Sequence, residues 1–214
     1  MKKKIFKLLT GMLLSCALAG STVAVQAEEA GTDTVKSYLT GEDVSVGIGH
    51  RRPIAVMLGN DTNGAPQSGT ENAGVIYEAP VEGSITRLMA IIEDYDNIPR
   101  IGSVRSCRDY FLFYANEYDA IYSHYGQAVY ALQYLDQHLI DNLNGLTLGN
   151  AYYRSTDRVA PHNAYTSWNG IMDSVAKKGY DTVYPQNFVK PFSFNEEDDK
   201  QIQIAGGETC NTFY

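Results

Sequence analysis

The stretch Glu78-Ala-Pro-Val-Glu82-Gly-Ser-Ile-Thr86-Arg87 opens the part of the chain, residues 78–126, that decides the fold. It continues through Ile101-Gly-Ser-Val-Arg105-Ser-Cys-Arg108-Asp109-Tyr110 and closes on Tyr118-Asp-Ala-Ile-Tyr-Ser-His124-Tyr-Gly126. Its apolar runs are typical of buried strands, yet they stand beside glutamates, arginines, an aspartate and a histidine. Folded proteins seldom bury so many charges without pairing or using them. We therefore predict that this stretch holds the functional site.

Strand-like and helix-like patterns alternate on both sides of this stretch. The run 52–60 is continuously apolar, which is typical of a strand buried on both faces. Further strands are expected at 75–81, 87–95, 100–104, 119–123 and 146–148, and helices near 107–118, 127–139 and 162–178. The helix at 127–139 would bury a stripe made of Val129, Leu132, Leu135 and Leu139. The alternation predicts an α/β domain over residues 50–190, a mixed sheet flanked by helices.

The N-terminus has the pattern of a secretory signal peptide over residues 1–27. Four lysines precede an apolar run, and Val25-Gln26-Ala27 fits a cleavage site. Leu13-Leu14-Ser15-Cys16 is an alternative, a lipoprotein box that would anchor the protein to the membrane through Cys16. We favour cleavage after Ala27, because apolar sequence continues well past Cys16. Either process places the mature protein outside the cytoplasmic membrane, secreted or attached to the envelope.

Two further segments complete the predicted organisation. Residues 28–49 are polar without a sustained period, which indicates a flexible linker. Residues 191–214 contain short strand-like runs around an acidic turn, as at the start of a second, β-rich unit. Cys107 is predicted to be a small buried residue before a helix, and its pairing with Cys210 stays open because sequence spacing says nothing about proximity.

The charge balance excludes one class of partner. Loss of residues 1–27 would remove four of the 17 basic residues and none of the 25 acidic ones, leaving a net charge of about −12. Nucleic acids require a basic face, so we expect no nucleic-acid partner. Adsorption to an anionic membrane is disfavoured for the same reason, and membrane attachment is expected only if Cys16 is lipidated.

Many short blocks in the chain occur in the order found in one protein family. They include Arg52-Pro-Ile-Ala-Val-Met, Tyr77-Glu-Ala-Pro-Val-Glu-Gly83, Gly102-Ser-Val-Arg-Ser106, Tyr118-Asp-Ala-Ile-Tyr122, His124-Tyr-Gly126 and Pro161-His-Asn163. Over residues 50–195 the chain resembles the N-terminal domain of the YerB-like putative lipoproteins, a family of unknown biochemical function found mainly in Gram-positive bacteria. The resemblance implies an envelope protein with a second, C-terminal domain, of which this chain would hold only the beginning. It supplies no established catalytic residue and no cofactor.

Arginines are the sharpest chemical feature of the central stretch. Arg87, Arg105 and Arg108 offer planar forks of donors, and together in one cleft they would bind a carboxylate or phosphate. We expect Asp109 and Asn163 to contribute to ligand binding beside them. The alternative is that each arginine pairs with a local acid, Glu78, Glu82 or Asp109, in a structural network.

Two histidines stand at the ends of predicted elements and could act as general acid and base. His124 ends a strand, His162 precedes a helix, and Glu82 is the best carboxylate candidate. The three are candidate catalytic residues for hydrolase or lyase chemistry on cell-wall glycan or peptide. No metal site is predicted, because no short ligand spacing is present. Since no complete catalytic constellation can be derived from spacing, binding of a cell-wall component or a wall-synthesis protein ranks ahead of an enzymatic activity.

Overall fold

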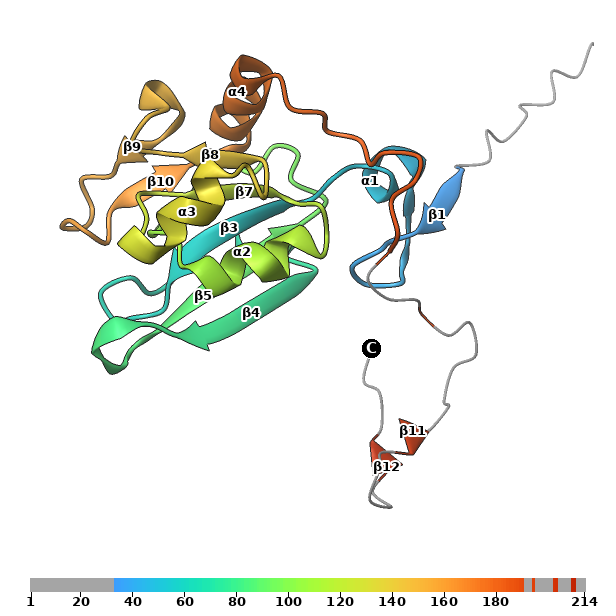
Figure 1. Ribbon diagram of the computed structural model, residues 1–214, viewed down its shortest axis with the longest axis horizontal. Coiled ribbons are helices and arrows are strands. Elements are labelled where there is room, and N and C mark those ends of the chain that lie inside the picture. The colour runs from blue at the N-terminus through green and yellow to red at the C-terminus, as the bar shows by residue number, and fades with distance from the viewer. Residues whose placement is uncertain (1–32, 191–193, 195–201, 204–208, 211–214) are drawn as a thin grey trace, which may run out of the picture. The chain divides into compact units, whose positions relative to one another are not determined.

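A five-stranded mixed sheet forms the centre of the fold (Figure 1). The structure is a computed structural model, and it describes residues 33–190, 194, 202–203 and 209–210. The strands follow in the spatial order β4 (Val75–Pro80), β5 (Thr86–Ile92), β3 (Ile54–Gly59), β7 (Ile121–His124) and β8 (Asn142–Asn144). β5 is antiparallel to β4 and β3, whereas β3, β7 and β8 are parallel. The predicted α/β class with a mixed sheet is confirmed, although β8 lies just before the strand expected at 146–148.

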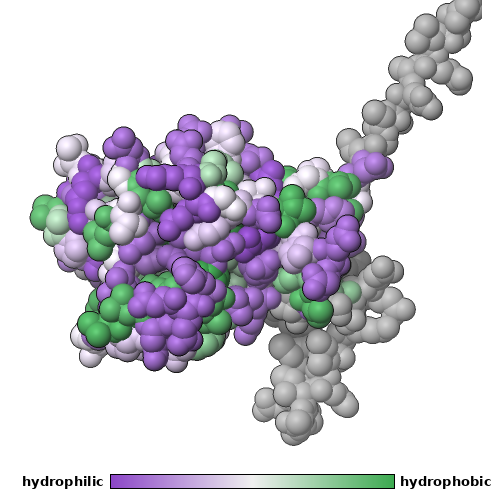
Figure 2. Space-filling view, turned by 45° about the horizontal axis from the view of Figure 1, so that its top comes forward, coloured by the Kyte–Doolittle hydropathy of each residue, from purple (hydrophilic) through white to green (hydrophobic). Residues whose placement is uncertain are grey.

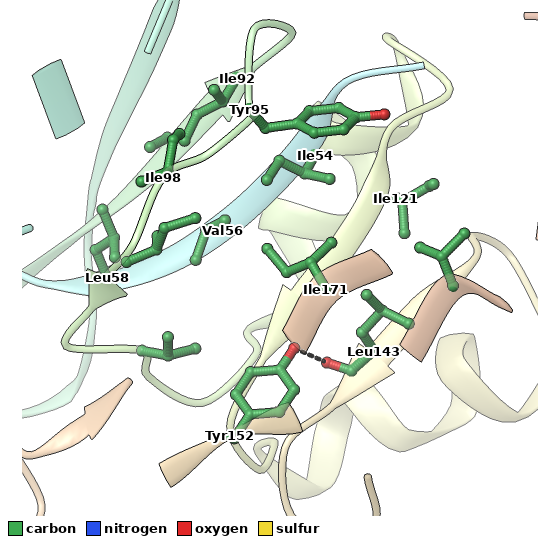
Figure 3. Close-up of a cluster of buried hydrophobic side chains, with 14 of the residues drawn as sticks. Ile54, Val56, Leu58, Ile92, Tyr95, Ile98, Ile121, Leu143, Tyr152 and Ile171 are labelled. Atoms are coloured by element: carbon green, nitrogen blue, oxygen red, sulfur yellow. Dashed lines mark hydrogen bonds between the residues drawn. The ribbon is translucent and has the colours of Figure 1, made fainter. Parts of the chain in front are cut away.

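Two hydrophobic clusters cover the two faces of this sheet, as the alternation along β3 requires. Val56 and Leu58 join the cluster that contains Ile171 of α4 (Trp168–Lys178), and Figure 3 shows these side chains converging. Ala55 and Met57 join the cluster built on α2 (Asp109–Asn116). Every residue of β3 is buried, which confirms the strand predicted from the continuous apolar run.

A small second sheet lies on the α4 side and shortens one predicted helix. Its order is β6 (Ile101–Gly102), β10 (Ala164–Thr166) and β9 (Tyr153–Arg154). The helix expected from residue 162 begins only at Trp168, because the residues before it pair in this sheet. Ser167 caps the helix by accepting a hydrogen bond from Gly170 N.

The helix predicted at 127–139 is also shorter than expected. A 3₁₀ turn, η3 (Val129–Ala131), precedes α3 (Leu132–Asp136), and His138 adopts a positive φ of 54° that ends the helical path. Val129 is 83% exposed and Leu132 is 37% exposed, so the predicted buried stripe is wrong at these two positions. Ala131 is instead buried in the α2-side cluster, and Leu135 and Leu139 pack against it.

The helix α2 matches its prediction closely, and so does the residue before it. Phe111 and Leu112 are fully buried against the sheet. Cys107, which precedes α2, is buried and carries a free thiol, as expected of a small packing residue. Burial raises the pKa of Cys107 to about 11, which leaves its thiol protonated and unreactive at neutral pH.

The N-terminal part of the described chain differs from the predicted flexible linker. β1 (Thr34–Lys36) and β2 (Asp43–Ser45) form an antiparallel hairpin that α1 (Val46–Gly49) follows. Leu39, in the turn of this hairpin, is buried in the α2-side cluster and anchors the segment. The predicted signal peptide, residues 1–27, lies outside the described residues.

The predicted C-terminal unit is described only in part. β11 (Ile202–Gln203) pairs with β12 (Thr209–Cys210) in antiparallel fashion, and most of 191–214 lies outside the described residues. Within the described chain, no helix combines the length and apolarity needed to cross a membrane. The face seen in Figure 2 is mostly hydrophilic, with apolar side chains in separate small patches. Three more 3₁₀ turns connect the elements: η1 (Thr70–Asn72), η2 (Glu82–Ser84) and η4 (Gly149–Ala151).

Candidate functional site

The candidate site lies where the parallel strands β3 and β7 end. The two strands pair over only part of their length, and the segment 103–107 lies between them beyond that point. Arg105 is held on both sides, because its N–H donates to Met57 O and its carbonyl accepts from Tyr125 N. Ligand sites of α/β proteins commonly lie at the carboxyl ends of parallel strands. The segment 103–107 therefore carries its side chains to a favourable place for a ligand.

Arg87 lies at the neighbouring start of β5 and is a buried cation without a bonded counter-ion. It is 6% exposed; its Nη1 donates to Ser106 O, and its Nε has no hydrogen-bond partner. Among the residues that the structure describes, no ion pair joins Arg87 to a carboxylate. Burial, together with the charges of Arg108 and Arg105, lowers the pKa of Arg87 to about 10. Proteins rarely bury a charged side chain without a partner of opposite charge.

Arg108 lies beside Arg87 and has a carboxylate partner. Its Nε is 2.9 Å from both carboxylate oxygens of Glu82, and its Nη2 donates to Oε2. Tyr130 Oη donates to Glu82 Oε1. The hydrogen bonds from Arg108 and then Tyr130 lower the pKa of Glu82 to about 2. Glu82 is therefore an ionised hydrogen-bond acceptor that is already occupied, which does not suit it to act as a general acid.

Arg105 links these groups to the loops on the other side of the segment. Its Nη1 donates to Pro161 O, next to His162. Burial lowers the pKa of Arg105. The charges of Arg108 and Arg154 also lower this pKa, whereas the charge of Asp61 raises it. His162 Nδ1 lies 3.0 Å from Asp61 Oδ1, so His162 ties its loop to the loop that follows β3.

His124 has no free ring nitrogen for a ligand. It is fully buried, with Nδ1 2.7 Å from Gly126 O and Nε2 3.3 Å from Asn142 Oδ1. Burial lowers the pKa of His124, and the two contacts with oxygen atoms oppose this shift. These bonds fix the turn after β7 and the adjacent β8, and they give His124 a structural role in this conformation.

Asn163 and Asp109 are likewise placed by local structure. Asn163 accepts from Arg154 Nη1 and donates to Ser155 O, which closes the loop before β10. Asp109 is the first residue of α2, where its negative charge interacts favourably with the helix dipole.

The structure brings together part of the set of site residues predicted from the sequence. Arg87, Arg105, Arg108 and Glu82 act on one another electrostatically. The three candidate catalytic residues each have different partners: Glu82 bonds Arg108 and Tyr130, His124 bonds the β7–β8 edge, and His162 contacts Asp61. In the described part of the chain, no group of three or more His, Cys, Asp and Glu side chains is placed to hold a metal ion.

Three residues of this region were not predicted from the sequence. Asp61 and Arg158 lie outside the strands and helices predicted from the sequence, and Tyr130 lies inside the helix predicted at 127–139. Arg158 Nη1 and Nη2 donate to Gly64 O and Pro66 O and hold two loops together. Asn63-Gly64 is a turn-forming pair, but no local signal pairs this loop with a residue 94 positions later.

The arrangement suits the binding of an anion. We call Arg87, Arg105 and Arg108 the arginine cluster. These three cations lie near one another and share one bonded carboxylate, Glu82. A negatively charged ligand group beside the cluster would neutralise part of this charge. Charge-assisted hydrogen bonds are about twice as strong as neutral ones.

Comparisons with known proteins point to one family. The family model described as "Protein of unknown function (DUF3048) N-terminal domain" matches residues 39–181. The chain is 36% identical over 183 residues to the "Putative lipoprotein YerB" of Bacillus subtilis (strain 168), a match that covers 83% of this chain and 54% of that protein.

A solved structure agrees with this result. The crystal structure of the YerB protein from Bacillus subtilis matches with a TM-score of 0.67 at 36% identity, over 70% of this chain and 51% of that one. The chain thus spans about half the length of these relatives. The resemblance stated from the sequence blocks is confirmed, and the chain belongs to the DUF3048 family through its N-terminal domain.

Proposed function

We propose that this chain is an extracytoplasmic envelope protein that binds an anionic group of a cell-wall component, or of a wall-synthesis protein, in the arginine cluster. The signal-like segment at residues 1–27 and the name of the Bacillus subtilis relative, "Putative lipoprotein YerB", support the location. Secretion with cleavage after Ala27 and attachment through Cys16 are both compatible with this function.

The observation that carries the proposal is the state of Arg87. A guanidinium that is 6% exposed, with an unpaired Nε and two cationic neighbours, is costly to keep in a folded protein. A structural ion network would instead give each arginine an acid, as Glu82 does for Arg108. An anionic ligand would supply the compensating charge that Arg87 lacks, and its binding would recover part of the cost of the uncompensated cation.

A binding experiment with matched variants tests this function. The chain from Glu28 to Tyr214 is incubated with purified peptidoglycan, and soluble wall fragments are then titrated by calorimetry. We expect retention without release of soluble fragments, and loss of retention in Arg87→Met. Arg51→Met removes the same charge at the other end of β3, where Arg51 pairs with Asp96, and should bind as the wild type does.

Other outcomes would redirect the proposal. Release of soluble fragments would favour the enzymatic alternative that acts on wall glycan or peptide. Equal retention of the wild type, Arg87→Met and Arg51→Met would mean that the arginine cluster is not the binding site. No retention at all, together with no binding of soluble fragments or of wall-synthesis proteins, would overturn the function.

A further inference from the structure

We infer that the ligand group bound by the arginine cluster is a carboxylate, and that it binds by replacing Glu82 on Arg108. This inference rests on the proposed anion-binding function and narrows it to one chemical class. It also assigns Glu82 a role: the protein's own carboxylate occupies the site while the ligand is absent.

The geometry of the Glu82–Arg108 pair defines the class of ligand. Arg108 Nε is 2.9 Å from both Oε1 and Oε2, and Nη2 also donates to Oε2, so the fork of donors holds a planar group with two oxygens. Tyr130 Oη adds a donor to Oε1. A carboxylate reproduces this set of contacts, because Glu82 is itself one. An arginine fork can also engage two oxygens of a phosphate, so the titrations below compare the two anions.

The unequal burial of the two partners makes the exchange possible. The Glu82 side chain is 57% exposed, whereas that of Arg108 is 10% exposed. Arg108 is also held by Cys107 O through Nη1. Departure of Glu82 would therefore leave the guanidinium in place and open its donors to a ligand.

The position of Glu82 in the chain favours such a departure. It lies at the tip of the β4–β5 hairpin in η2, where Gly83 and Ser84 both have positive φ values, 75° and 59°. The tip residues 82–85 are all exposed. A hairpin tip without core side chains can move at lower cost than a packed element.

The surroundings of Tyr130 suggest what the rest of the ligand looks like. Tyr130, whose hydroxyl contacts Glu82, is 45% exposed, and Val129, the residue before it, is 83% exposed, so exposed apolar residues occur in the segment that contacts the site. A peptide ending in a small apolar residue with a free carboxylate combines both features. N-acetyl-alanyl-alanine is therefore a suitable probe, and its C-terminal amide is the matched control.

Calorimetry with the chain from Glu28 to Tyr214 tests the exchange. We expect the free acid to bind Glu82→Gln at least about tenfold more tightly than the wild type, the scale of one charge-assisted hydrogen bond. Glu82→Asp keeps the charge but is one methylene too short for the same contacts, and it should also tighten binding. The amide should bind none of these proteins. For inorganic phosphate, the gain in affinity from wild type to Glu82→Gln should be smaller than for the acid.

The variants separate exchange from a simple change of net charge. Glu117→Gln removes an exposed acid at the end of α2 and should leave the affinity unchanged. Acid binding that is equal in wild type, Glu82→Gln and Glu82→Asp would overturn the exchange while leaving anion binding intact. A gain in Glu82→Gln without one in Glu82→Asp would show charge repulsion and would also overturn it. If neither acid nor phosphate binds any variant or the wild type while the chain still binds wall fragments, the carboxylate exchange fails and the proposed function stands. A melting temperature for each variant verifies that the proteins compared are folded.

Discussion

Arg52 and Arg87 are equally buried near opposite ends of β3, yet their partners differ completely. Both are 6% exposed. Arg52 reaches the carboxylates of Asp119 and Asp141 and the carbonyls of Asp119 and Asp181, which satisfies its guanidinium. Arg87 reaches one carbonyl and has cations for neighbours. The protein's own groups compensate the charge of the first arginine but not that of the second, and this difference is the basis of the proposed anion site.

The largest effect that this comparison predicts is on stability. Arg52→Met should lower the free energy of unfolding by about 3 kcal/mol, because two carboxylates and two carbonyls around a buried site would lose their hydrogen-bond donor. Arg87→Met should change the free energy of unfolding by less than about 1 kcal/mol, because Arg87 forms no ion pair that the substitution would break. Urea unfolding followed by circular dichroism measures both. Equal destabilisation by the two variants would remove the distinction between the two ends of β3.

The next effect is on binding. Arg105→Ala should weaken the binding of an anionic wall fragment by about 2 kcal/mol, the scale of a lost charged hydrogen bond. Calorimetric titration measures the change, and Arg51→Ala provides the control with the same charge loss. If Arg105 serves only to hold Pro161 O, the variant would instead melt at lower temperature and bind as before.

The smallest effect concerns acid pH and Glu82. Its pKa is lowered to about 2 by Arg108 and Tyr130, against an ordinary value of 4.5. A lowered folded-state pKa stabilises the protein above pH 4.5, and this contribution disappears as the pH falls from about 4.5 to about 2. Because the side chain is largely exposed, the contribution should stay below about 1 kcal/mol.

Unfolding titrations at several pH values detect this contribution. Glu82→Gln should lose less stability than the wild type between pH 4.5 and pH 2.5, while Glu117→Gln should follow the wild type. Identical acid profiles for Glu82→Gln and the wild type would show that the Glu82–Arg108 pair contributes nothing to the folded state.

Local sequence patterns were enough to predict the mixed α/β class and the central strands, but not the position of the strand expected at 146–148, the second sheet or the extent of the helices. The buried strand β3 and the helix α2 have unbroken periods, and both were predicted. The period over 127–139 is as regular, yet Val129 points to solvent. Periodicity reports which residues could share a face, and only packing decides whether that face is covered.

The site could be predicted by residue type but not by pairing. Arg87, Arg105 and Arg108 were identified because arginines beside buried strands are unusual. Which of them has an acid depends on a hairpin tip that carries Glu82 across to Arg108, a contact between positions 26 apart in sequence. Asp61 and His162 meet over an even longer separation, which no spacing rule reveals.

One measurement tests the contrast between Arg52 and Arg87 most directly. In a protein labelled with ¹⁵N-arginine, the Nε–H signals of Arg87 and Arg52 are followed by NMR during titration with N-acetyl-alanyl-alanine. The account predicts that the Arg87 signal shifts and saturates while the Arg52 signal stays fixed. An Arg87 signal that remains as constant as that of Arg52, in a titration with any anionic wall fragment that the protein binds, would contradict it.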